Sequence, residues 1–376
     1  MRSLTMMALF GFITVIGCGS PPDNGARIQF TASGEVLALH GYDFPPAPGT
    51  ALPGYFPDGW EITFDELLVT FDNITLSENP DLSPTDESQA GRMVAQVTGP
   101  WAIDLHKGGP LPGKGGADEQ AYPIVTIKNQ NKNGNQAFDP TKKYAFGFDI
   151  VKATSSAQKL NFDATNTADY ATMVQNGWTV LYSGTATYKG GANCIIQGDS
   201  SYPFNAPPMN TQVKFKFGFS SPATYINCQN PDLTGAGFPG EEHPRGVQVK
   251  ANDTVIAQAT VHTDHPFWES FEHDTPPHFD QLAARAQNVS GTWTVTLSDV
   301  VNDNYTSLTD RSGRPVPWRV CVPESAYSPP DAAPVMHFDD TGIHQPSLSY
   351  AAFMTYNQST QGHLNSDGLC FVRRNY

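Results

Sequence analysis

Residues 262–278, HTDHPFWESFEHDTPPH, concentrate side chains of the types that bind metal ions. Four of the ten histidines of the chain lie in this stretch, interleaved with aspartates and glutamates. Neutral imidazoles and carboxylates are good ligands for zinc and copper. The stretch therefore raises the hypothesis of a transition-metal site, and its candidate ligands are His262, Asp264, His265, His273 and His278.

The element before this stretch is expected to position the first ligands. Alternating apolar residues predict a strand that ends near His262, with His262 and Asp264 on one face and His265 at the turn beyond. The following PFWESFEH could form one helical turn that returns His273 toward the same place, with His278 at the start of the next helix. The alternative is that His and Asp side chains at a strand end only bridge neighbouring elements.

The sequence HTDH resembles part of the H-x-H-x-D-H motif of metallo-β-lactamase-fold hydrolases. The resemblance covers His262, Asp264 and His265, and Thr260 stands where the family has its first histidine. It implies a metal-dependent hydrolase. In such an enzyme a carboxylate near the metal, such as Glu269 or Glu272, would act as the general base.

A second group of histidines lies near the C-terminus. His337, His344 and His363 occur with Asp367 and with Met336, and imidazole together with thioether favours copper. If one of these histidines approaches His262 in space, the metal hypothesis is strengthened, because distant histidines rarely converge for packing reasons alone.

The segment NQNKNGNQAFD, residues 129–139, resembles an EF-hand-type calcium loop, with Asn129, Asn131 and Asn133 as oxygen donors and Gly134 at the turn. Pro140 occupies the place of the bidentate glutamate. Calcium is therefore a less favoured cofactor than copper or zinc, and an Asn-Gly turn that closes a hairpin or a longer loop is the alternative.

The N-terminus predicts export and lipidation. Residues 1–17 carry one arginine and an apolar run from Leu9 to Ile16, which is shorter than the roughly 20 residues of a membrane-spanning helix. VIGC, at Val15 to Cys18, resembles the bacterial lipobox, which implies cleavage after Gly17 and lipidation of Cys18. Gly19, rather than Asp, follows the cysteine, and this resemblance favours the outer membrane.

The charge of the chain limits its partners. The formal net charge is −15, and it becomes −16 once residues 1–17, whose only charge is Arg2, are removed. A chain this acidic, with no cluster of basic residues, excludes nucleic acid as a favoured partner and leaves the lipid anchor as the contact with the membrane.

Cysteine usage agrees with an oxidising compartment. Apart from Cys18, the chain has an even set of Cys194, Cys228, Cys321 and Cys370. Of the three pairings, the sequential one, Cys194 with Cys228 and Cys321 with Cys370, is favoured because it closes the shorter loops.

The composition, with 33 Gly and 31 Pro, predicts an all-β protein of short strands and turns: an antiparallel β-sandwich or jelly roll with short helical insertions. Strands are expected within 59–79, 142–154, 178–188, 211–219, 246–262 and 291–300, and helices near 169–177 and 279–288. In residues 59–79 the apolar parity switches, which predicts two strands or one strand with a bulge.

The turn-rich stretch 230–246 suggests a boundary. It would separate a β-sandwich domain at 28–230 from a second β-rich domain, or a continuation of the same sandwich, at 246–376, after a signal peptide at 1–17 and a tether at 18–27. Three functions follow as hypotheses: a non-catalytic binding protein with a copper or zinc site, a carbohydrate-binding or adhesion module, and a metal-dependent hydrolase.

Overall fold

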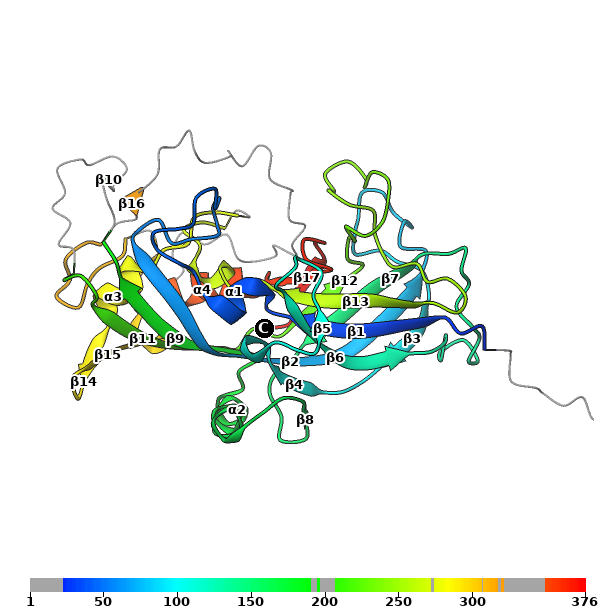
Figure 1. The fold of residues 1–376 in the computed structure, drawn as a ribbon, viewed down its shortest axis with the longest axis horizontal. Helices are drawn as coiled ribbons and strands as arrows, with labels where there is room; N and C mark the ends of the chain where they lie inside the picture. Colours follow the sequence, from blue (N-terminus) through cyan, green and yellow to red (C-terminus); the bar gives the residue numbers. More distant parts are fainter. Residues whose placement is uncertain are drawn as a thin grey trace, which may run out of the picture.

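The computed structural model describes residues 23–190, 195–196, 207–271, 274–305, 307–316, 319–320 and 349–376. Within these ranges the protein consists of two large curled sheets with a few short helices (Figure 1). Several predicted functional residues lie outside the described residues: Cys18, Cys194, Cys321, His273, His337 and His344.

The smaller sheet has the strand order β17-β13-β1-β6-β5. Its strands are β1 (Arg27–Ser33), β5 (Leu111–Pro112), β6 (Gln120–Ile127), β13 (Thr254–Val261) and β17 (Gly362–Leu364). Strands β1 and β13 run parallel and the other neighbours are antiparallel.

The larger sheet has the order β14-β15-β11-β9-β2-β7-β12-β18, and β3, β4 and β8 pair beside this path. Its strands are β2 (Trp60–Glu78), β3 (Met93–Val97), β4 (Trp101–Asp104), β7 (Tyr144–Ile150), β8 (Gln158–Lys159), β9 (Val180–Tyr188), β11 (Gln212–Phe219), β12 (Ala223–Ile226), β14 (Gln287–Val289), β15 (Thr292–Thr296) and β18 (Phe371–Arg374). A separate pair is formed by β10 (Ile195–Ile196) and β16 (Arg319–Val320).

The main core lies between the two sheets. Phe30 of β1 contacts Phe71 of β2 and Phe148 of β7, with ring centroids 5.9 and 6.2 Å apart. Burial of aromatic rings from facing sheets is the interaction that holds a sandwich together. The prediction of an all-β, sandwich-like fold with short helices is confirmed, although the sheets are mixed rather than purely antiparallel.

The long strand β2 shows the predicted change of face. Its register against β9 shifts between Phe64 and Glu66, so that Ile62 and Phe64 share the buried face with Leu67 and Val69 beyond the shift. A bulge inserts one residue and reverses the alternation that follows it. The alternative of one bulged strand is therefore the correct one.

The helices are short: α1 (Glu35–His40), α2 (Ala164–Asn176), α3 (Asp280–Arg285) and α4 (Tyr350–Gln358), with 3-10 turns η1 (Leu105–Lys107), η2 (His265–Phe267) and η3 (Leu297–Asp299). Helix α2 ends at Gly177 in a left-handed conformation, as the sequence predicts, and packs Tyr170 and Met173 on the outer face of the larger sheet (Figure 1). Among the described helices, none is long and apolar enough to cross a membrane.

The stretch 230–246 does not separate two independent sets of strands. Strand β13 pairs with β1, and β15 pairs with β11, so each large sheet contains strands from both sides of it. Residues 128–143 also join the sheets, since β6 and β7 lie in different ones. In this loop Asn131 exchanges two hydrogen bonds with the backbone of Gln96, which makes the Asn-Gly turn part of a longer loop.

Cys228 and Cys370 form a disulfide across 142 residues of sequence. The predicted partners, Cys194 for Cys228 and Cys321 for Cys370, are therefore wrong. The preference for short loops considers only the entropy of the unfolded chain. In the folded chain β12 and β18 are neighbours, with Ile226 opposite Phe371, and the two cysteines follow and precede these strands.

Candidate metal site

Parallel pairing of β1 and β13 brings the first acidic residue to the predicted histidines. Ser33 lies opposite Thr260 at the ends of the two strands. Because parallel strands end at the same edge of a sheet, the residues that follow them also meet. Glu35 at the start of α1 thus lies beside His262, with Glu35 Oε1 3.5 Å from His262 Nε2.

Antiparallel pairing of β13 and β17 brings a histidine from the C-terminal part of the chain. His363 lies opposite Thr260, and His262 follows two residues later on the same face, so His262 and His363 are diagonal neighbours. Their ring centroids are 4.1 Å apart. The expected meeting of the two histidine groups therefore occurs at His363.

Three imidazoles now surround one small volume. The ring centroid of His265 lies 5.5 Å from that of His262 and 5.6 Å from that of His363. Three imidazoles that bind one ion with metal–nitrogen distances of about 2 Å have centroids about 5 Å apart. The ligand atoms close enough to hold one ion are those of His262 and His265 together with Asp264, and the ring of His363 lies beside this group.

A carboxylate completes the group. Ligand atoms of His262, Asp264 and His265 all lie within 4.8 Å of one another. His265 and His363 are completely or almost completely buried, and Asp264 is 3% exposed. The structure thus brings His262, Asp264 and His265 together at the end of β13.

Hydrogen bonds orient the imidazole of His265. The hydroxyl of Thr360 donates its only proton to the carbonyl of Asn357 at 2.7 Å, so it accepts the hydrogen bond from Nδ1–H of His265, also at 2.7 Å. The lone pair of neutral His265 is then on Nε2. Such outer contacts fix the tautomer of metal-binding histidines.

His262 and Asp264 are oriented in the same way. The carbonyl of Ser366 can only accept, so Nε2 of His262 donates to it at 3.2 Å and, in the neutral ring, Nδ1 keeps the lone pair. Nε1–H of Trp268 donates to Oδ2 of Asp264 at 2.8 Å. The indole also stacks on His265, with ring centroids 3.8 Å apart.

The electrostatics of the cluster favour a cation. Burial disfavours the charged form of His262, but the carboxylates of Glu35 and Asp264 outweigh this effect and raise its pKa. Burial also raises the pKa of Glu35 to about 7, against the opposing effect of His262. A metal ion would supply the positive charge that a proton on His262 otherwise supplies.

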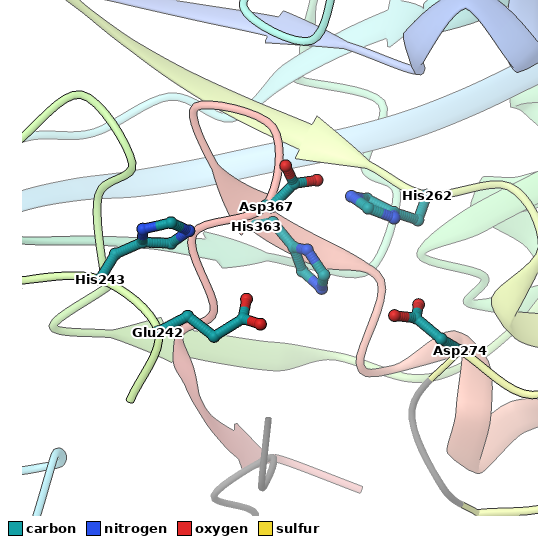
Figure 2. A pocket seen from close by; sticks show the side chains of 6 residues that line it. All are labelled: Glu242, His243, His262, Asp274, His363 and Asp367. Atoms are coloured by element: carbon teal, nitrogen blue, oxygen red, sulfur yellow. The ribbon is translucent and has the colours of Figure 1, made fainter. Parts of the chain in front are cut away.

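A pocket of about 500 Å³ opens onto this cluster, and each of its lining residues is of a metal-binding type (Figure 2). They are Glu242, His243, His262, Asp274, His363 and Asp367. In Figure 2 the side chains of Glu242 and His243 lie across the pocket from His262. An ion bound by the buried histidines would therefore be accessible from this side.

The wall with Glu242 and His243 is held by buried polar groups. The backbone N–H groups of both residues donate to Gln229 Oε1 at 3.0 and 3.1 Å. Arg245, 1% exposed, donates from Nε to Glu241 at 2.8 Å and stacks on Phe238. The loop that presents the two residues is thus attached to the body by several hydrogen bonds.

The structure does not bring His278 to the cluster. Its Nε2 lies 2.7 Å from Glu269 Oε2 and its Nδ1 lies 3.7 Å from Asp58 Oδ2. The two carboxylates outweigh the effect of burial and raise the pKa of His278 to about 10. His278 is a buried cation between two acids, and Glu269, a candidate general base, is its partner.

Comparison with known proteins gives no relative: no protein-family model, curated protein or solved structure matches the chain.

Proposed function

We propose that this protein is a lipid-anchored, extracytoplasmic, non-catalytic binding protein with a copper or zinc site at His262, Asp264 and His265, beside which the ring of His363 lies. The observation that carries the proposal is the convergence of three histidines whose rings lie within 5.6 Å of one another, two of them held in a defined tautomer. Buried polar side chains that only stabilise a fold rarely come together as three imidazoles.

The cellular location is part of the same proposal. The lipobox-like VIGC supports lipidation at Cys18 and anchoring at the outer membrane, and the disulfide between Cys228 and Cys370 suits an oxidising compartment. Copper and zinc are both available to histidine and carboxylate ligands there. Calcium has less support, because the amide of Asn131, one of the predicted oxygen donors, is engaged by Gln96.

The metal content of the purified protein tests this proposal. The full chain, isolated from the cell envelope without chelators or a histidine tag, is expected to bind copper or zinc tightly. A His262→Ala/His265→Ala variant is expected to lose this ion, as measured by elemental analysis after incubation with each metal. His40→Ala, which removes an exposed histidine, is the control and should retain the metal.

A wild-type protein that takes up neither metal, or a double variant that keeps it while remaining folded, would overturn the proposal. The carbohydrate-binding alternative predicts glycan binding that is unaffected by loss of the two histidines, so the same variants separate these functions.

The pocket favours one second candidate, a metal-dependent hydrolase. An ion at His262 and His363 would face a space lined by carboxylates that could accept a proton from a bound water. The zinc-loaded protein would then hydrolyse ester, amide or phosphate substrates, and the activity would disappear in the double variant. Absence of turnover by metal-loaded protein across these substrate classes would leave the non-catalytic function.

A further inference from the structure

The proposed ion leaves most of the acidic groups of the pocket unused. The carboxylate of Asp264 belongs to the histidine-rich group, here called the inner position. Two further carboxylates group with His262 alone, and two others line the pocket. A single divalent ion carries two positive charges, fewer than the number of carboxyl groups at these positions, which total five. The five residues are Glu35, Glu242, Asp264, Asp274 and Asp367.

A second set of ligand atoms lies next to the first. Atoms of Glu35, His262 and Asp367 lie within 4.8 Å of one another, which gives a second group of the size that one ion needs. We call this group the outer position. It shares only His262 with the inner position, and it is richer in oxygen ligands.

His262 has a nitrogen available for each position. Its Nε2 lies 3.5 Å from Glu35 Oε1, and Figure 2 shows one ring nitrogen turned toward Asp367 and the other toward the opposite side of the ring. The two nitrogens of an imidazole point in divergent directions. Two ions bound to them, each at about 2 Å, would be about 6 Å apart.

We propose that the outer position binds a second divalent transition-metal ion and that the imidazole of His262 bridges the two ions. Glu35 and Asp367 supply one carboxylate oxygen each, and His262 supplies Nε2. The second ion displaces the proton that Nε2 otherwise donates to the Ser366 carbonyl, and this proton is released to the solvent, leaving the ring as a bridging imidazolate. The proposal rests on the proposed metal binding at the inner position.

The surroundings suit such a pair of ions. The outer position faces the pocket of about 500 Å³, so an ion can enter without movement of the sheets. Glu242 and His243 line the opposite wall and offer further ligand atoms. Ser366, whose carbonyl oxygen is 3.2 Å from Nε2, lies in the short turn between β17 and β18 together with Asp367.

Titration of the metal-free full chain with copper(II) tests the proposal. Ultrafiltration with elemental analysis gives the number of ions bound, and electron paramagnetic resonance reports whether they interact. We expect two ions per chain. The first gives the signal of an isolated copper ion, and the second reduces this signal because an imidazolate couples the two spins. The Glu35→Gln/Asp367→Asn variant is expected to bind one ion with the isolated signal.

The control variant is Glu61→Gln/Asp81→Asn, which removes one glutamate and one aspartate from partly exposed ion pairs with Lys189 and Lys143. It should behave as the wild type. Circular dichroism verifies that each variant is folded, and the wild-type titration is informative without any variant.

Each outcome has a distinct meaning. A wild type that binds a single ion overturns the outer position and leaves the proposed function intact, whereas a wild type that binds none overturns both. Two ions without spin coupling, or two ions retained in the Glu35→Gln/Asp367→Asn variant, would place the second ion elsewhere and contradict the bridging role of His262.

Discussion

Thr360 is not a ligand of the inner position. Its hydroxyl nevertheless determines which nitrogen of His265 carries the lone pair that faces this position. This hydroxyl accepts a hydrogen bond from Nδ1–H of His265 and donates one to the Asn357 carbonyl. A valine has the same shape without this acceptor, so Nδ1 and Nε2 would become equivalent candidates for the proton. The ring would then present a lone pair to the metal only part of the time.

Thr360→Val is therefore expected to weaken metal binding about 10- to 100-fold, the usual effect of losing such an outer contact. Competition with a chromophoric chelator measures the affinity. Thr360→Ser keeps the hydroxyl and should retain most of the metal affinity. If Thr360 had a purely structural role, Thr360→Val would lower the thermal stability without changing the metal affinity.

His278 illustrates a histidine with a structural role in the same stretch of sequence. Its pKa is raised to about 10 by Asp58 and Glu269, from an ordinary value of 6.5. Because the pKa of His278 is higher in the folded than in the unfolded chain, its protonation stabilises the fold. This stabilisation is complete below pH 6.5 and is lost as the pH rises toward 10. The ion pairs contribute on the order of 3 kcal/mol at neutral pH.

His278→Gln is expected to unfold at lower urea concentration at pH 6 and to show a weaker decrease in stability between pH 6.5 and 10 than the wild type. Urea unfolding across this pH range measures both. An unchanged slope in the variant would show that His278 does not carry a charge in the folded protein.

At the residue scale, the part of the site that the sequence predicts is the local part. His262, Asp264 and His265 lie within four residues of one another, and their approach depends only on the end of one strand. His363 and Glu35 could be noticed only as residue types, because their approach to His262 depends on the register of β17 and β1 against β13. Nothing in a single sequence specifies that register.

At the element scale, the strands that the sequence predicts are those in which apolar and polar residues alternate strictly. β7, β9 and β11 coincide with aromatic-rich runs of period two, and the bulge in β2 follows from its change of parity. Helix α4 had no such signal. Its buried side combines Tyr350, Phe353, Met354 and Tyr356 with the polar Asn357 and Gln358, and Ala351, Ala352 and Thr355 are partly exposed, so no clear separation of apolar and polar residues marks the helix.

The pairing of β12 with β18 has a consequence for the cysteines. With Cys228 joined to Cys370, Cys194 and Cys321 remain besides Cys18, which the proposed lipidation would occupy. The strands β10 and β16, which adjoin Cys194 and Cys321 in sequence, pair with Ile195 opposite Val320. We predict a second disulfide between Cys194 and Cys321.

Peptide mapping of the unreduced exported protein is expected to find both of these disulfides and neither of the sequential pairings. Cys228→Ser/Cys370→Ser should lower the free energy of unfolding by up to about 5 kcal/mol, since the bond closes a long loop. A peptide containing Cys194 linked to Cys228 would contradict the assignment.

At the scale of the whole molecule, buried acids shape the response to pH. Burial and the nearby Glu241 raise the pKa of Glu87 to about 8, despite the favourable effect of Arg245. A carboxyl group whose folded-state pKa is raised above its unfolded value favours folding at low pH. Its contribution is lost as the pH increases from about 4.5, the ordinary value, to 8.

The fold is therefore expected to be more stable near pH 5 than at pH 8, by on the order of 3 kcal/mol from this group. Glu87→Gln replaces the acid with a neutral side chain of the same shape, and its stability should vary less across this range. Thermal unfolding from pH 4.5 to 8.5 provides the measurement, and identical pH profiles for variant and wild type would exclude this role of Glu87.

The disulfide between Cys228 and Cys370 also bears on when the pocket is completed during the life of the protein. Gln229, next to Cys228, holds the wall with Glu242 and His243, while the segment that ends at Cys370 carries His363 and Asp367. The bond thus joins the two halves of the pocket, and it can form only after the chain leaves a reducing compartment. For the exported, metal-binding protein proposed above, translocation would precede formation of this bond, and the two walls of the pocket would be joined covalently only outside the cytoplasm.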